Sequence, residues 1–183
     1  MDARTPRFIR YFTCSFSLLT RIFLLMPPEF SIRKSRSDFH RPPPWVPENA
    51  IFFITINCQN RRRAKLTLDE TSKGLLDSFW HYQELGKWHI SLTLLMPDHL
   101  HALLCFNNDQ GLGMGKVIKS WKRYTARAFA IDWQRDYFDH RIRSENDMTD
   151  KWNYIRENPV RAGHVNSYEK WSHVLRGDGT KGW

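Results

Sequence analysis

From about residue 48 onward, apolar residues follow two different periodicities along the chain. Four short runs rich in β-branched and aromatic residues predict strands, at 50–56, 90–96, 100–106 and 137–143. Three segments with apolar residues at helical spacing predict helices, at 69–87, 112–131 and 147–158. The last helix is expected to end at Pro159, because proline has no backbone N–H to donate.

The predicted order of elements, β-α-β-β-α-β followed by a helix, is that of a ferredoxin-like (βαββαβ) fold. The fold class is therefore α+β, with a mostly antiparallel sheet, helices on one face and an extra C-terminal helix. Alternation along the third strand places Leu100, Ala102 and Leu104 on an apolar side that should face the core. His99 and His101 fall on the other side, where we expect a site that can be reached from solvent.

These two histidines stand at positions i and i+2 of an apolar run, directly after a Pro97-Asp98 turn signal. In a strand, both imidazoles point to the same face of the sheet. Imidazole is a common metal ligand and titrates near neutral pH, so the pair indicates a metal or catalytic site. A pair of half-buried, hydrogen-bonded structural histidines is the alternative interpretation.

The third predicted helix can present a phenol and an amide together. Met148, Trp152 and Ile155 cluster on one side of it and should pack inward. Tyr154 lies about 100° or more from these residues, and Asn158 follows one turn later on nearly the same face. Taken alone, this pattern is also that of an ordinary half-buried tyrosine and a helix-terminal asparagine.

Composition favours a polyanionic partner. The 183 residues contain 28 Lys and Arg against 19 Asp and Glu, which gives a formal net charge of +9. Such an excess suits nucleic acid or an anionic membrane, and the 14% aromatic content suits base stacking as well as core packing. Cys14, Cys58 and Cys105 are widely spaced and form no C-x-x-C pair, which favours the reducing cytoplasm.

The second predicted helix carries much of this charge and contains no acidic residue. Four of its basic residues fall in one stripe, Lys116, Lys119, Arg123 and Arg127. Four other residues are expected on the opposite, inward side, Val117, Trp121, Tyr124 and Ala128. Because a solvated helix face normally mixes both signs, the stripe favours phosphate binding, and so do Arg61, Arg62 and Arg63 in a loop.

A glycine-rich stretch precedes this helix but does not match a phosphate-binding P-loop. Gln110 stands where the motif needs its first glycine, and Val117 stands where it needs Ser or Thr. We therefore interpret these glycines as a flexible start to the helix and expect no nucleotide cofactor.

One compact domain is expected at 46–175, with a short tail at 176–183. Residues 1–45 form a basic, proline-containing extension that is not expected to be well ordered. The apolar residues from Phe12 to Met26 follow several arginines, as in a secretory signal, but Arg21 interrupts them and Pro27 follows. Met1 and Met26 both stay open as the native start, and we expect no membrane association.

Three blocks carry a resemblance to a known family. Residues 96–101 (MPDHLH) resemble the His-hydrophobic-His motif of single-tyrosine HUH transposases, and residues 133–143 resemble a second conserved stretch. Residues 154–163 (YIRENPVRAG) resemble the catalytic helix and the turn after it. The chain is most similar to the REP-associated tyrosine transposase branch, from about Trp45 to Trp171.

The resemblance implies a mechanism. Tyr154 would attack a phosphodiester of single-stranded or hairpin DNA and form a 5′-phosphotyrosine. His99 and His101, completed by Asn158 and less readily by Glu157, would hold a divalent metal. Two imidazoles alone would suit Zn²⁺ or another transition metal, whereas the family implies Mg²⁺ or Mn²⁺. Family members are commonly dimers, so a homodimer is implied, with the active site formed in cis or in trans.

Three alternatives stay open on the sequence. A non-catalytic DNA-binding protein derived from a transposase would keep the basic helix, and a domesticated one can keep the site residues too. A metal-dependent hydrolase or nucleotide transferase would also use histidines, but the histidine-triad class needs a third His where Leu103 stands. A basic RNA-binding module would need no pairing of a tyrosine with a metal site.

Overall fold

The computed structural model describes residues 49–106 and 113–183. Predictions about the extension at 1–45 and the run from Phe12 to Met26 lie outside the described residues. So does Gly111, the first glycine of the stretch that precedes the second predicted helix. The described elements are β1 (Ile51–Asn57), α1 (Asp69–Glu84), β2 (Trp88–Leu95), β3 (His99–Phe106), α2 (Met114–Phe129), β4 (Phe138–Arg141), α3 (Glu145–Arg161), a short 3₁₀ helix (Tyr168–Lys170) and β5 (Val174–Arg176). Every strand and helix expected from the sequence is present, with boundaries displaced by a few residues.

The described strands form one sheet in the order β4-β1-β3-β2-β5, and every neighbouring pair is antiparallel. The first four strands stand in the order of a ferredoxin-like fold, which confirms the predicted fold class. No pattern in the sequence predicted β5. The segment that follows β5 turns back toward this strand, where the Gly182 N–H donates to the Val174 carbonyl at 3.0 Å. The packed domain thus continues beyond residue 175.

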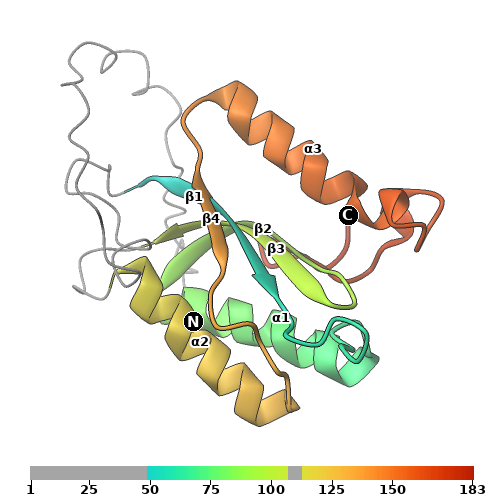
Figure 1. Ribbon diagram of the computed structural model, residues 1–183. Helices are drawn as coiled ribbons and strands as arrows, with labels where there is room; N and C mark the ends of the chain where they lie inside the picture. The colour runs from blue at the N-terminus through green and yellow to red at the C-terminus, as the bar shows by residue number, and fades with distance from the viewer. Residues whose placement is uncertain (1–48, 107–112) are drawn as a thin grey trace, which may run out of the picture. The chain divides into compact units, whose positions relative to one another are not determined.

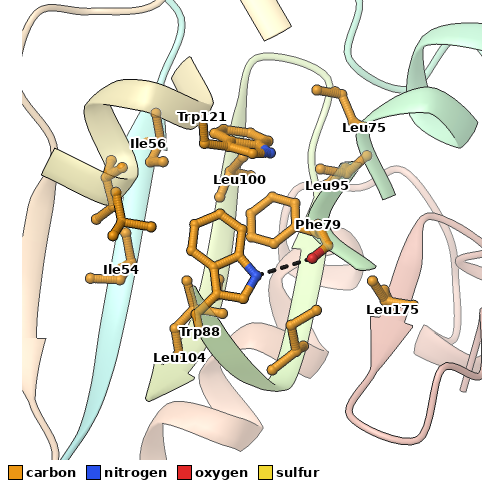
Figure 2. Close-up of a cluster of buried hydrophobic side chains, with 14 of the residues drawn as sticks. Ile54, Ile56, Leu75, Phe79, Trp88, Leu95, Leu100, Leu104, Trp121 and Leu175 are labelled. Carbon is orange, nitrogen blue, oxygen red and sulfur yellow. Dashed lines mark hydrogen bonds between the residues drawn. The ribbon is translucent and has the colours of Figure 1, made fainter. Parts of the chain in front are cut away.

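One face of the sheet is covered by α1 and α2 (Figure 1). Their apolar residues meet those of β1, β2 and β3 in the larger of two hydrophobic clusters, which includes Leu100, Ala102 and Leu104 as expected. Trp88 fills the centre, and its indole N–H donates to the Phe79 carbonyl at 3.0 Å (Figure 2). The buried indole therefore has its polar group satisfied, as close packing in an apolar interior requires.

The other face is covered by α3, which lies across the sheet from α1 and α2 (Figure 1). Met148, Trp152 and Ile155 turn inward here as predicted, onto a second cluster with Phe53 and Leu103. The expectation that helices occupy one face only is therefore wrong. The extra helix covers the histidine face, because an apolar run such as β1 needs burial on both sides.

The bounds of α3 differ from the prediction at its C-terminal end. The helix begins at a Ser144 cap, whose hydroxyl accepts from the Asp147 N–H at 3.1 Å. It passes through Pro159 and ends at Arg161, so the expected stop before the proline is wrong. Proline removes only one backbone donor, and the Ala162 N–H still bonds to the Asn158 carbonyl. The Arg161 guanidinium also donates to the Tyr154 carbonyl at 3.2 Å, across the proline turn.

The predicted basic stripe of α2 is exposed along its whole length, and Val117 and Trp121 are buried as expected. The inward placement of Tyr124 and Ala128 is wrong, since both are exposed. The buried side of the helix instead includes Thr125, whose hydroxyl accepts from the Trp133 indole at 3.0 Å. This contact rotates the helix and turns Tyr124 toward solvent.

Lys122 of the same helix does not belong to the exposed stripe. Its ammonium group is buried and donates to the carbonyls of Gln134 and Arg135, at 2.6 and 2.9 Å. Burial lowers the pKa of this lysine, and Asp136 opposes the change. Lys122 thus fastens α2 to the segment that leads into β4.

In the described part of the chain, no helix is long and apolar enough to cross a bilayer.

Candidate active site

A cleft of about 490 Å³ lies where β3 and the end of β1 meet α3. Its lining brings together residues from three stretches of the chain, Thr55, Asn57, Arg61, Met96, Asp98, His99, His101, Tyr154, Asn158, Ala162 and His164. All four residues predicted for catalysis or metal binding are therefore in one place, although more than fifty positions separate the histidines from the tyrosine.

His101 forms the floor of this cleft, with 3% of its surface exposed. The Asn158 amide nitrogen lies 2.9 Å from its Nε2, and the Thr55 hydroxyl lies 2.9 Å from its Nδ1. Because the amide N–H donates to Nε2, the ring proton is on Nδ1 and is donated to Thr55. Burial, followed by the nearby charges of His99 and Arg161, lowers the pKa of His101 to about 3. The ring is therefore neutral at physiological pH, with its Nε2 lone pair toward the cleft.

His99 also lines the cleft, and its ring centroid lies 4.8 Å from that of His101. The Asp98 carboxylate lies 2.6 Å from its Nδ1 and accepts from the Arg61 guanidinium at 2.5 Å. Burial lowers the pKa of His99, and Asp98 opposes this change. Burial alone would raise the pKa of Asp98, but the hydrogen bonds from Arg61 and His99 hold it below its ordinary value. A carboxylate in this position fixes a ring orientation, as the outer partners of metal-bound histidines do.

Tyr154 is 40% exposed and lines the same cleft from α3. Its ring centroid lies 5.4 Å from that of the same chain's His101 and 5.8 Å from that of Phe53. The Arg161 guanidinium lies over the phenol ring, 4.3 Å from its centroid. Asn158, one turn further along α3, faces the cleft as the helical spacing predicts. The candidate residues of a single chain thus meet without a second copy.

The donor set of the cleft can be compared with what a divalent ion needs. No group of three His, Cys, Asp or Glu residues able to hold a metal occurs among the described residues. A site in the cleft would have to combine the two imidazoles with the Asn158 amide oxygen, after rotation of that amide. Two ligands on adjacent octahedral positions, each roughly 2.1 Å from one ion, lie about 3.0 Å apart. The 2.9 Å between the side chains of His101 and Asn158 fits this spacing.

The residues predicted to bind DNA lie on two separate surfaces. Arg61 lines the cleft, and Arg62 and Arg63 are exposed in the same loop. Lys116, Lys119, Arg123 and Arg127 lie on the outer side of α2, across the sheet from the cleft.

Three residues in or beside the cleft have contacts that the sequence did not predict. Thr55 and Asp98 hold the two imidazoles, and Arg161 covers the tyrosine ring. Asp98 was predicted only as part of the turn and of the MPDHLH block, although an acid directly before a histidine is a signal for an orienting carboxylate. No local pattern could have singled out Thr55, because its partner is set by the pairing of β1 with β3.

The fold and cleft define a class of protein, the ferredoxin-like α+β domains in which a His-hydrophobic-His strand faces a tyrosine on a helix. No protein-family model matches the chain. A Haemophilus influenzae protein assigned to the REP-associated tyrosine transposases is 24% identical over 144 residues, covering 69% of this chain and 79% of that protein. The REP-associated tyrosine transposase of Escherichia coli K12 is 28% identical over 123 residues, covering 66% of this chain and 72% of its own length.

A solved structure of a REP-associated tyrosine transposase bound to a REP hairpin has the same fold. Its TM-score is 0.61 at 22% identity, over 73% of this chain and 80% of that one. The predicted resemblance is confirmed: in sequence, the chain is a relative of the REP-associated tyrosine transposases.

Proposed function

We propose that this protein is an HUH-type DNA strand transferase that cuts and rejoins single-stranded DNA through Tyr154. The observation that carries the proposal is the convergence of Tyr154, His99, His101 and Asn158 on one cleft. The two curated relatives, both assigned to the REP-associated tyrosine transposases, support the same class of reaction.

The proposed reaction is a transesterification with Tyr154 as the nucleophile. The phenol oxygen attacks the phosphorus of a phosphodiester, a tyrosyl–phosphorus bond forms, and the bond from phosphorus to the 3′ oxygen breaks. The phenol proton leaves to solvent and the 3′ oxygen takes up a proton, so the products are a 5′-phosphotyrosine and a free 3′-OH. A second strand's 3′-OH reverses the same steps. The bond is conserved throughout, so no nucleotide cofactor is needed.

A divalent ion, Mg²⁺ or Mn²⁺, is part of this proposal, and His99, His101 and Asn158 would hold it. When bound, the ion would polarise the phosphate and stabilise its developing negative charge. Within the chain, Thr55 and Asp98 orient the two imidazoles, while Arg161 stacks on the tyrosine ring. Each functional group is thus held by a second residue before any substrate arrives, which limits reorganisation during the reaction.

The partner in this proposal is single-stranded DNA, including folded hairpins. The solved relative is bound to a REP hairpin. In this chain, Arg61 places a cation at the cleft, and the acid-free α2 stripe supplies a second cationic surface. The family resemblance adds a homodimer to the proposal, and the wide spacing of the cysteines adds a cytoplasmic location.

The test is the formation of a covalent adduct. Labelled hairpin DNA with single-stranded flanks is incubated with the protein and Mn²⁺ or Mg²⁺, and the products are separated on a denaturing gel. We expect an adduct that Tyr154→Phe abolishes. Tyr124→Phe is the matched control, since Tyr124 is 51% exposed on α2 and should not affect the adduct. Metal-dependent cleavage that survives Tyr154→Phe would contradict the tyrosine mechanism.

One observation favours a second candidate, a non-catalytic DNA-binding protein. His101, Thr55 and Asn158 satisfy one another's hydrogen bonds, as a purely structural histidine would require. In that case the protein binds the hairpin, no adduct forms, and Tyr154→Phe leaves the affinity unchanged.

A further inference from the structure

Phe138 is the most exposed of the large aromatic side chains in the described residues, with 56% of its surface exposed. It lies on β4, the strand at the edge of the sheet beside β1 (Figure 1). Single exposed apolar residues are common and need no explanation by themselves. The position of Phe138 relative to the cleft is what gives it meaning.

Strand register places Phe138 in one cross-strand row with the catalytic floor. Thr55 of β1 pairs with Phe138 on one side and with His101 on the other. Residues directly opposite each other in an antiparallel sheet point to the same face, and adjacent strands lie about 4.8 Å apart. The Phe138 ring is therefore on the same face as the His101 ring, two strands away.

Ring contacts confirm this placement and bring in the tyrosine. Phe53, which is buried, lies 6.2 Å from Phe138 and 5.8 Å from Tyr154, measured between ring centroids. One buried ring therefore supports both exposed rings. A single strand whose phosphate reaches Tyr154 would pass Phe138 within one or two nucleotides, since these distances are of the order of one nucleotide step.

Two cations lie beside the rings of Phe53 and Tyr154. The Lys151 ammonium is 5.6 Å from the centroid of Phe53, and the Arg161 guanidinium lies over Tyr154. Exposed aromatic rings with cations nearby bind single strands without sequence preference, because bases stack on the rings while the cations follow the phosphates.

On this evidence we propose that Phe138 is a base-stacking subsite for single-stranded DNA, which receives a nucleobase next to the phosphate that Tyr154 attacks. The inference rests on the proposed function, because it needs a strand in the cleft. It adds a residue that positions the substrate without touching the reacting atoms.

The test separates stacking from backbone binding. Two labelled probes of equal length are titrated by fluorescence anisotropy, an oligothymidylate and an oligomer of abasic sugar-phosphates. Phe138→Ala should weaken oligothymidylate binding roughly 5- to 100-fold and leave abasic binding unchanged. Phe138→Trp should restore the affinity, and Phe138→Leu, which keeps the apolar contact with Phe53, should behave like Phe138→Ala. Leu85→Ala is the matched control, since Leu85 is 47% exposed at the end of α1, on the far side of the sheet and outside the basic stripe of α2.

The possible outcomes distinguish base stacking at Phe138 from backbone binding and from contact between copies of the chain. An equal loss of affinity for both probes, or the same loss of affinity in Leu85→Ala, overturns the subsite. A change of oligomeric state in Phe138→Ala, measured by sedimentation, assigns the ring to a contact between copies and also overturns it. Unchanged oligothymidylate binding with a normal Tyr154 adduct refutes this inference and leaves the proposed function intact. A wild-type protein that binds no single strand refutes both.

Discussion

Replacing the Thr55 hydroxyl by a methyl group, in Thr55→Val, tests how the cleft is held. The hydroxyl lies 2.9 Å from His101 Nδ1, and His101 is only 3% exposed, so water cannot take its place. A buried N–H left without a partner costs about 1–3 kcal/mol of unfolding free energy. Loss of the residue that orients a metal-bound histidine typically lowers metal affinity about 10- to 100-fold.

The chain offers a matched control on β2, which β3 separates from the strand of Thr55. Thr93 is fully buried, and its hydroxyl has no partner among the residues described. Thr93→Val makes the same chemical change and should leave stability equal or slightly higher, because an unpaired hydroxyl leaves the core. Urea unfolding measures the stability, and Mn²⁺ titration calorimetry measures the affinity. Equal effects of the two substitutions on both quantities would refute the assigned role of Thr55.

Further predictions concern pH, site assembly and two basic residues. The pKa of His101 falls from 6.5 in the unfolded chain to about 3 in the fold, so on acidification the unfolded state binds the proton first. The contribution of His101 to the free energy of unfolding is therefore complete above pH 6.5 and declines as the pH falls below it. In metal-free protein this residue contributes a slope of about 1.4 kcal/mol per pH unit between pH 6 and 4.5, which urea titrations should find absent in His101→Gln. Mixing Tyr154→Phe with His101→Ala protein should restore no DNA adduct, because both groups come from one chain; restored adduct on a denaturing gel would show a shared site. Lys122→Met should lower the unfolding free energy by about 1–3 kcal/mol, since its carbonyl partners lose a buried donor, and a change within error in urea unfolding would contradict this. Arg161→Lys keeps the charge but loses the planar stack on Tyr154, so single-turnover adduct formation should slow roughly 3- to 30-fold; an unchanged rate would remove Arg161 from the site.

Helical spacing and strand alternation in the sequence were sufficient to predict the main helices and strands. They also predicted which side chains of β3 and α3 share a face. Leu100, Ala102 and Leu104 turn to the core, and His99 turns to the cleft, because side-chain direction in a strand depends only on parity. Tyr154 and Asn158 share a face because one helical turn separates them. Such local periodicities need no knowledge of the partners.

Local periodicity failed where a neighbour overrides it. In β2, the pairing register shifts between Ile90 and Leu92, so that Trp88 and Ile90 belong to the larger cluster and Leu92 to the smaller one. One extra residue in a strand moves every later side chain of that strand to the opposite face of the sheet, and the sequence pattern does not show where such an extra residue lies. Tyr124 faces solvent for a similar reason, because a contact of Thr125 with Trp133 sets the rotation of α2.

The sequence by itself determined which residues could do chemistry at this site and which of them face the same way within one element. Only the tertiary structure decided that they meet. The extra helix had to cover the second apolar face of the sheet, and this burial carried Tyr154 to within 5.4 Å of the His101 ring, centroid to centroid. Distances between residues so far apart in sequence depend on how whole faces pack, since the free energy of burying those faces outweighs any local preference.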